Sequence, residues 1–294
     1  MAAIPIGALI GGNFLDVIAD LDPKRKAERE RELRQQAERR AEEERQRAEK
    51  ERQDREALEQ YMRDLGIDPA DPDISDSDIE DARQDINYDA AVANIAVVGN
   101  VNAGKSLLLN AIRNLSYGDP DWAPTGGSAV TRQRHRYADP AHNCVWYDLP
   151  GAGTQRVTAF SYYYSQKLFA YDKIVLVHET TLTESDIRLL RICEHFKQPC
   201  IVVRTKSDIH IYNYTKEREW TWAQAKETFL SEARQDVARF RGQVEASQAK
   251  FVPDFDDFAV STSGIRGFVR KERSPKELDE ARFFEELERK KLMS

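Results

Sequence analysis

Residues 99–106 read Gly-Asn-Val-Asn-Ala-Gly-Lys-Ser, and this stretch decides the fold. It follows an apolar run at residues 95–98 and precedes a helical pattern that begins at Lys105. Glycine allows backbone N–H groups to turn inward, and the start of a helix adds partial positive charge. A strand, a glycine-bounded loop and a helix in this order predict a phosphate-binding loop.

The loop assigns roles to side chains around a bound polyphosphate. We expect Lys105 to reach the β- and γ-phosphates and Ser106 to bind Mg²⁺. An ordinary glycine turn is the alternative, and the strand before it and the helix after it disfavour that interpretation. Further contacts to the phosphates are expected from Gly99, Asn102, Ala103, Gly104 and Leu107.

The second motif, Asp-Leu-Pro-Gly at residues 148–151, ends the next apolar run. A carboxylate at Asp148 can hold Mg²⁺ through water, and the Gly151 N–H can contact the γ-phosphate. By itself this tetrapeptide is a common turn. Its position at the end of a strand after a phosphate-binding loop gives it weight.

The third motif, Thr-Lys-Ser-Asp at residues 205–208, follows the apolar run 200–203. Asp208 offers two acceptor oxygens to the N1–H and N2–H₂ donors of guanine, which adenine lacks. The Lys206 stem can lie along the base, next to Thr205. After the apolar run 258–260, Ser261 and Thr262 are further candidates for contacts to the base. The three motifs predict a site for GTP or GDP with Mg²⁺.

Residues 123–131 lie between the first helix and the next strand and are expected to form a switch loop. Thr125 or Thr131 is expected to complete the Mg²⁺ shell when GTP is bound. The sequence does not choose between them, and a plain loop threonine is the alternative for each.

From residue 91 onward apolar runs alternate with helical stretches, which predicts a parallel sheet covered on both faces. The fold class is therefore α/β, a Ras-like P-loop GTPase domain with a long charged N-terminal helix and extra C-terminal helices. Strands are predicted at 94–98, 144–147, 173–177, 200–203 and 258–260, and helices at 105–114, 161–169 and 185–196.

Five segments are predicted along the chain. They are an apolar N-terminal segment at 1–20, a charged helix at 21–66, an acidic linker at 67–90, a GTP-binding domain at 91–268 with a helical insertion at about 215–250, and a C-terminal helix at 269–294. The first segment is too short to span a bilayer, which takes about 20 apolar residues. Packing against the body is favoured there over a peripheral membrane contact.

The charged helix carries acid-first pairs at i,i+4, such as Glu43 with Arg47. Its apolar positions are sparse, so a solvated single helix is favoured over a coiled-coil partner. The whole chain has 44 basic and 51 acidic residues, a net charge of -7, which gives no general attraction to nucleic acid. Three dispersed cysteines indicate a reducing compartment, and we expect a cytoplasmic protein.

Residues in and near the expected switch regions resemble those of a known family. Residues 125–135, 146–153 and 203–208, together with Asp186 and Ile187, resemble the immunity-related GTPases, the interferon-inducible family, fungal relatives included. The resemblance covers about residues 94–212. It implies a dynamin-like habit, with GTP-dependent self-association into a homodimer or oligomer, slow hydrolysis accelerated in the assembly, and contact with intracellular membranes.

Two departures from that family bear on what the resemblance implies. The family carries a large helical domain after its GTPase domain, whereas about thirty residues follow Ser263 here. The phosphate-loop position that often holds an acid in that family is Asn100. Activation in trans that relies on this acid is therefore not carried over.

The residues that follow the second motif, and the arginines near the switch loop, predict a slow GTPase. Ala152 stands where Ras-type GTPases place a water-orienting glutamine, and Arg132, Arg134 and Arg156 are candidates for an activating positive charge. The predicted function is binding and slow hydrolysis of Mg-GTP, stimulated by self-association, in a switch or assembly protein. One alternative is a GTP-loaded interaction module that does not hydrolyse and uses the charged helix as effector arm. A P-loop kinase or ATPase leaves Asp208 unexplained.

Overall fold

The structure is a computed structural model that describes residues 23–65, 74–126, 133–151, 158–246, 253–272, 274 and 276–289. The chain divides into two units, Met1–Gln60 and Tyr61–Ser294. All three motifs lie in the second unit, so this unit carries the site. The predicted N-terminal segment 1–20 lies outside the described residues.

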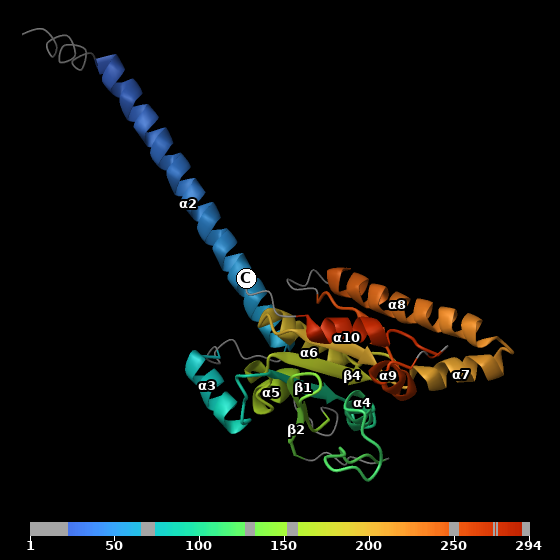
Figure 1. The fold of residues 1–294 in the computed structure, drawn as a ribbon. Coiled ribbons are helices and arrows are strands. Elements are labelled where there is room, and N and C mark those ends of the chain that lie inside the picture. Colours follow the sequence, from blue (N-terminus) through green and yellow to red (C-terminus); the bar gives the residue numbers. More distant parts are fainter. Residues whose placement is uncertain are drawn as a thin grey trace, which may run out of the picture. The chain divides into compact units, whose positions relative to one another are not determined.

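The second unit is built on a six-stranded sheet in the order β2-β3-β1-β4-β5-β6. Figure 1 labels three of these strands, β1, β2 and β4. Its strands are β1 (Ala93–Gly99), β2 (His135–Asp139), β3 (Cys144–Asp148), β4 (Lys173–His178), β5 (Cys200–Arg204) and β6 (Asp257–Ala259). Among the strands that the structure describes, only the pairing of β2 with β3 is antiparallel. The carboxyl ends of the five parallel strands therefore meet at one edge, as the predicted α/β P-loop fold requires.

Helices cover both faces of this sheet. They are α3 (Asp76–Asp85), α4 (Lys105–Ile112), α5 (Ala159–Ser165), the short 3₁₀ turn η2 (Leu168–Ala170), α6 (Glu184–His195), α7 (Ser207–Glu217), α8 (Trp222–Ala246), α9 (Thr262–Val269) and α10 (Glu280–Glu288). Alternate strand residues such as Val97, Val175 and Val203 share one core with apolar side chains of α4, α9 and α10. On the opposite face, Leu176 lies with α5 and α6, and Ala259 packs against α7 and α8.

Strand β2 was not among the strands predicted from the sequence. Its burial alternates, with Tyr137 and Asp139 buried and Arg136 and Ala138 exposed, because β2 lies at the edge of the sheet. A search for continuous apolar runs finds strands that are covered on both faces and misses a polar edge strand of this kind.

The stretch predicted as an acidic linker, residues 67–90, contains helix α3, which corrects that expectation for its second half. Ser75 and Asp78 form a capping box at the start of α3. At its other end, Asp85 accepts hydrogen bonds from Arg134 at 2.8 Å and pairs with Lys167 at 2.9 Å. These long-range pairs give α3 partners within the unit, which local composition could not show.

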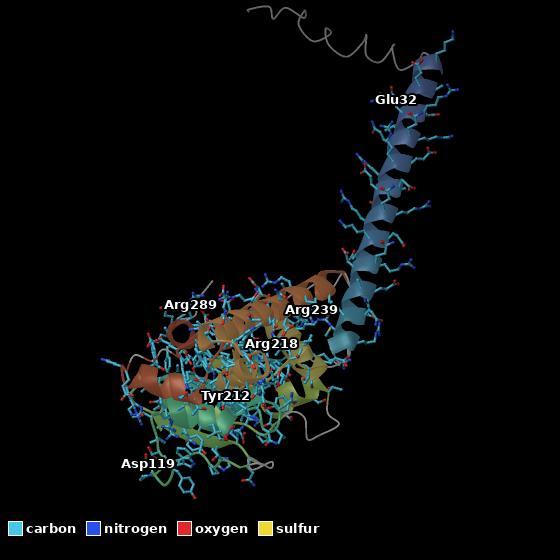
Figure 2. The ribbon with its side chains drawn as sticks, turned by 90° about the vertical axis from the view of Figure 1, so that its right-hand side faces the viewer. Glu32, Asp119, Tyr212, Arg218, Arg239 and Arg289 are labelled. Atoms are coloured by element: carbon cyan, nitrogen blue, oxygen red, sulfur yellow. The ribbon has the colours of Figure 1, made fainter. Side chains whose placement is uncertain are left out.

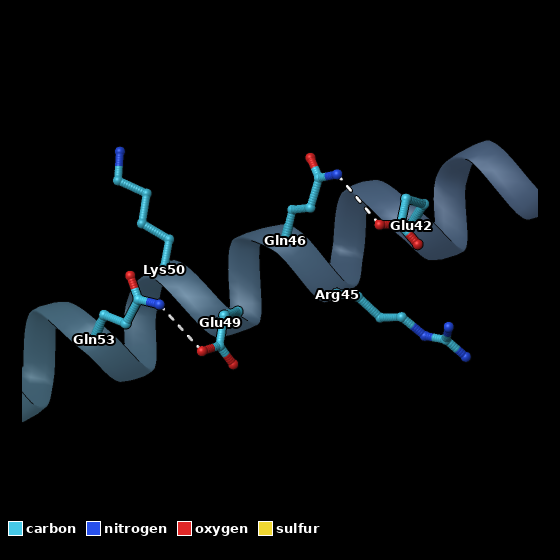
Figure 3. A pocket seen from close by; sticks show the side chains of 6 residues that line it. All are labelled: Glu42, Arg45, Gln46, Glu49, Lys50 and Gln53. Atoms are coloured by element: carbon cyan, nitrogen blue, oxygen red, sulfur yellow. Dashed lines mark hydrogen bonds between the residues drawn. The ribbon is translucent and has the colours of Figure 1, made fainter.

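Helix α2 (Pro23–Leu65) is exposed along residues 27–57, and side chains project from it on all sides, as around Glu32 (Figure 2). Figure 3 shows how neighbouring turns are linked: Gln46 donates to Glu42 at 3.3 Å and Gln53 donates to Glu49 at 3.1 Å. Such exposed contacts contribute little individually. The exposed side chains of α2, with their charges of both signs, are typical of a solvated helix. None of the helices described is long and apolar enough to cross a membrane.

A buried charge network lies under the sheet edge, between the ends of β4 and β5 and the start of β6. The Asp257 side chain is 2% exposed; it contacts His178 Nε2 at 2.8 Å and accepts a bond from Arg204 Nη2 at 2.8 Å. Burial raises the pKa of Asp257, but the hydrogen bonds from His178 and the charge of Arg204 outweigh it and lower that pKa. The carboxylate thus stabilises the fold above the pKa of an unfolded aspartate and loses this effect as pH falls through its own lower pKa.

We therefore predict that Asp257→Asn lowers the free energy of unfolding by ~3–5 kcal/mol near neutral pH, because the buried Arg204 loses its nearer carboxylate and is left with that of Asp236 at 3.5 Å. The difference should begin to shrink on acidification below about pH 4, where an unfolded aspartate becomes protonated, and it should be lost as pH falls through the lower pKa of the folded Asp257 carboxylate. Urea unfolding across this pH range measures both effects. Asp254→Asn, which removes the partner of Arg241 in an exposed pair, is the matched control and should change little. Equal losses in the two variants would contradict the prediction.

Candidate functional site

The phosphate-loop backbone adopts conformations that its residues permit. Gly99 has φ 137°, and a Cβ there would lie 2.0 Å from the carbonyl oxygen of Val177 in β4. Gly104 and Asn102 also have positive φ, at 88° and 66°. Glycine and asparagine are the residues that reach this region most easily, so the sequence fixes the loop's turn between β1 and α4.

Lys105 lies folded over this loop. The residue is 8% exposed, and its Nζ donates hydrogen bonds to the carbonyls of Gly99 at 3.1 Å and Asn100 at 2.9 Å. Burial lowers the pKa of Lys105, while the charges of Asp148 and Asp186 oppose that shift. The loop therefore holds an ammonium group where phosphates would gather.

The two side chains predicted to hold Mg²⁺, those of Ser106 and Asp148, are in contact. Ser106 Oγ donates to Asp148 Oδ2 at 2.7 Å, and Asp148 is 1% exposed at the end of β3. A hydroxyl and a carboxylate fit Mg²⁺, which usually binds one or two carboxylates together with phosphate oxygens and water. Thr125 is exposed outside regular structure, and Thr131 lies outside the described residues. The choice between these two threonines stays open.

The Asp-Leu-Pro-Gly turn lies against the phosphate loop. A Cβ on Gly151 would stand 2.9 Å from the Val101 nitrogen, so the two backbones approach closely there. Tyr162 in α5 donates to the Pro150 carbonyl at 2.8 Å and fixes the turn from its other side. The structure thus brings together the two motifs predicted to surround the γ-phosphate.

The motif predicted to bind guanine, residues 205–208, contacts the same loop. Thr205 Oγ1 lies 2.6 Å from the Ala103 carbonyl oxygen, to which it donates. Lys206 has φ 54°, and its Nζ pairs with Glu179 at 2.6 Å. Asp208 lies in the first turn of α7 and is partly exposed. The motif therefore begins directly beside the phosphate loop.

Ser261 has a structural task that sequence reasoning missed. It caps α9 by accepting a bond from Gly264 N at 2.8 Å, and its own N–H donates to Glu280 Oε1 at 3.1 Å. Burial raises the pKa of Glu280, which is fully enclosed. Thr262 is partly exposed at the start of α9. Contact of Ser261 and Thr262 with a base stays a prediction, and no local signal marks Glu280 as their neighbour.

Of the three arginines considered as activating charges, Arg134 is the one within the described residues. It pairs with Asp85 at 2.8 Å and also donates to the Asp85 carbonyl at 3.1 Å. An activating role for Arg134 therefore requires that it leave α3.

The sequence of the chain is similar to those of known GTPases. The profile of the interferon-inducible GTPase (IIGP) family matches residues 73–247, more than half of the chain. Interferon-inducible GTPase 1 of Mus musculus is 32% identical over 154 residues, 52% of this chain and 37% of that protein. Interferon-gamma-inducible GTPase 10 of Mus musculus is 28% identical over 166 residues, 54% of this chain and 40% of that protein. The match thus spans well under half the length of these relatives.

Among solved structures, a probable GTP-binding protein engB is similar, with a TM-score of 0.36 and 17% identity over 66% of this chain and 98% of that chain. The three motifs all lie within the residues that the family profile matches, whereas Ser261 and Thr262 lie beyond them.

Proposed function

Because the chain belongs to the interferon-inducible GTPase family, we propose that it binds Mg-GTP and hydrolyses it slowly to GDP and phosphate. The observation that carries this proposal is the contact of Ser106 with Asp148 at 2.7 Å beside the buried Lys105. Two separate sequence elements, residues 99–106 and residues 148–151, converge there. Their groups are those needed to hold a polyphosphate and its metal ion.

Each group has a defined task in this proposal. Lys105 balances charge on the β- and γ-phosphates, and the Gly151 N–H contacts the γ-phosphate. Ser106 and Asp148 would hold Mg²⁺, which supplies further charge neutralisation when bound. Asp208 selects guanine by accepting from its two donor groups.

Hydrolysis is proposed to be slow in the single chain and faster in a nucleotide-dependent homodimer or oligomer. The support is Ala152, which cannot orient a water molecule, and the engagement of Arg134 by Asp85. Position 152 therefore provides no water-positioning side chain, and position 134 provides no cationic side chain, for the transition state. A second copy of the chain can supply one.

We expect turnover per molecule to rise with protein concentration. The experiment measures phosphate release over a range of protein concentrations at saturating Mg-GTP. Light scattering or sedimentation with GTP and with GDP reports association in the same samples. Fast turnover that is independent of concentration would contradict the self-association proposal, although it would still support GTP hydrolysis.

A second candidate function, a GTP-loaded module that does not hydrolyse, is favoured by one observation. Helix α2 is exposed along residues 27–57 and offers an extended charged surface as effector arm. Single-turnover measurements at high protein concentration separate the two functions, because only an enzyme converts bound GTP to GDP there.

The proposed location is the cytoplasm, with peripheral contact to intracellular membranes. Free thiols at Cys144, Cys193 and Cys200 support a reducing compartment. The membrane contact derives from the resemblance to the family. Fractionation with and without GTP tests both.

A further inference from the structure

A side chain of the phosphate loop reaches out of the site to helix α6. Asn100 Nδ2 donates to Asp186 Oδ2 at 3.3 Å and lies 3.4 Å from Thr183 Oγ1. The backbone carbonyl of Asn100 accepts the bond from Lys105. One residue thus links the phosphate-binding lysine to a neighbouring helix.

Asp186 is a buried carboxylate with a local task of its own. It is 2% exposed and completes the capping box of α6, accepting from Thr183 N at 2.9 Å and from Thr183 Oγ1 at 2.7 Å. A capping box of this kind is a common way to start a helix. This one differs because it also accepts a bond from the phosphate loop.

We propose that Asn100 and Asp186 form a positioning pair that fixes the phosphate loop to α6 and so sets the affinity for the β-phosphate. The inference rests on the proposed function and adds regulation of that same site. Movement of α6 at its capping turn would then change phosphate affinity without any contact between α6 and the nucleotide.

The experiment is a double-mutant cycle over Asn100→Asp, Asp186→Asn and the two combined. Asn100→Asp places two carboxylates against each other, so we expect the ratio of GDP affinity to GMP affinity to fall by on the order of 10-fold. In the combined variant the amide at position 186 donates to the carboxylate at position 100. The ratio should then return to within about 3-fold of the Asp186→Asn value.

The chain offers a matched control in the capping box of α3. Asp78 accepts from Ser75 N at 2.9 Å and from Ser75 Oγ at 2.6 Å, nearly as Asp186 does from Thr183, and no phosphate-loop bond joins it in the described structure. Asp78→Asn should change thermal stability as a cap does and leave the GDP-to-GMP ratio unchanged. If Asp186 were only a helix cap, Asp186→Asn would likewise change thermal stability and leave the GDP-to-GMP ratio unchanged.

Two outcomes would overturn the inference. If the combined variant stays as weak as Asn100→Asp, the new carboxylate acts directly on the phosphates and Asp186 plays no part. If all three ratios equal that of the wild type, the pair does not position the loop. Failure of the unmodified protein to bind GDP would overturn the proposed function and the inference with it, whereas GDP binding with unchanged ratios would overturn the inference alone.

Discussion

Lys105→Met should weaken GTP and GDP binding by about 10²–10³-fold, since it removes one partner of a desolvated charge pair with the phosphates. Methionine keeps most of the buried stem, so the effect isolates the ammonium group. GMP binding should change much less, because Lys105 is expected to contact the β- and γ-phosphates. Calorimetry with the three nucleotides measures these differences.

Stability provides the control for this variant. In the free protein the ammonium group is buried and bonds only to the carbonyls of Gly99 and Asn100 among the bonds described. Its removal relieves the desolvation that lowers the pKa of Lys105. Unfolding by urea should therefore shift little. Unchanged GDP affinity in Lys105→Met would contradict the assignment of residues 99–106 to a phosphate site.

The phosphate loop could be predicted because its signal is local. Gly99, Asn102 and Gly104 adopt positive φ, and the apolar run before them forms β1 as expected. Asp148 ends β3 and Thr205 follows β5, and the parallel pairing of β1 with β3 and β4, and of β4 with β5, brings both residues to the edge of the sheet where the loop lies. Local turn chemistry and strand periodicity therefore account for most of the candidate site.

The remainder depends on contacts between residues far apart in the sequence. Asp85 meets Arg134 across 49 positions, and Asn100 meets Asp186 across 86. Glu280 reaches Ser261 from a helix that begins after the predicted domain boundary. A single sequence shows the charge of each residue, but which charge another residue approaches is decided by packing.

Asp208→Asn should reverse the base preference of the site. Guanine presents two donors to the carboxylate, so the loss of two charge-assisted hydrogen bonds lowers GTP affinity by about 10²–10⁴-fold. Xanthine carries a carbonyl oxygen in place of the guanine amino group. An asparagine amide can donate to that oxygen and accept from the neighbouring N–H, so xanthosine triphosphate should bind the variant more tightly than it binds the wild type.

Competition among GTP, ATP and xanthosine triphosphate measures this change in both proteins. Glu217→Gln, at the exposed opposite end of α7, is the matched control and should retain the preference for GTP. Asp208→Asn must still bind polyphosphate through Lys105, because Asp208 is expected to contact the base alone. A GTP preference unchanged in Asp208→Asn would show that guanine is read elsewhere, and it would leave the contact of Thr205 with Ala103 as a structural link between α7 and the loop.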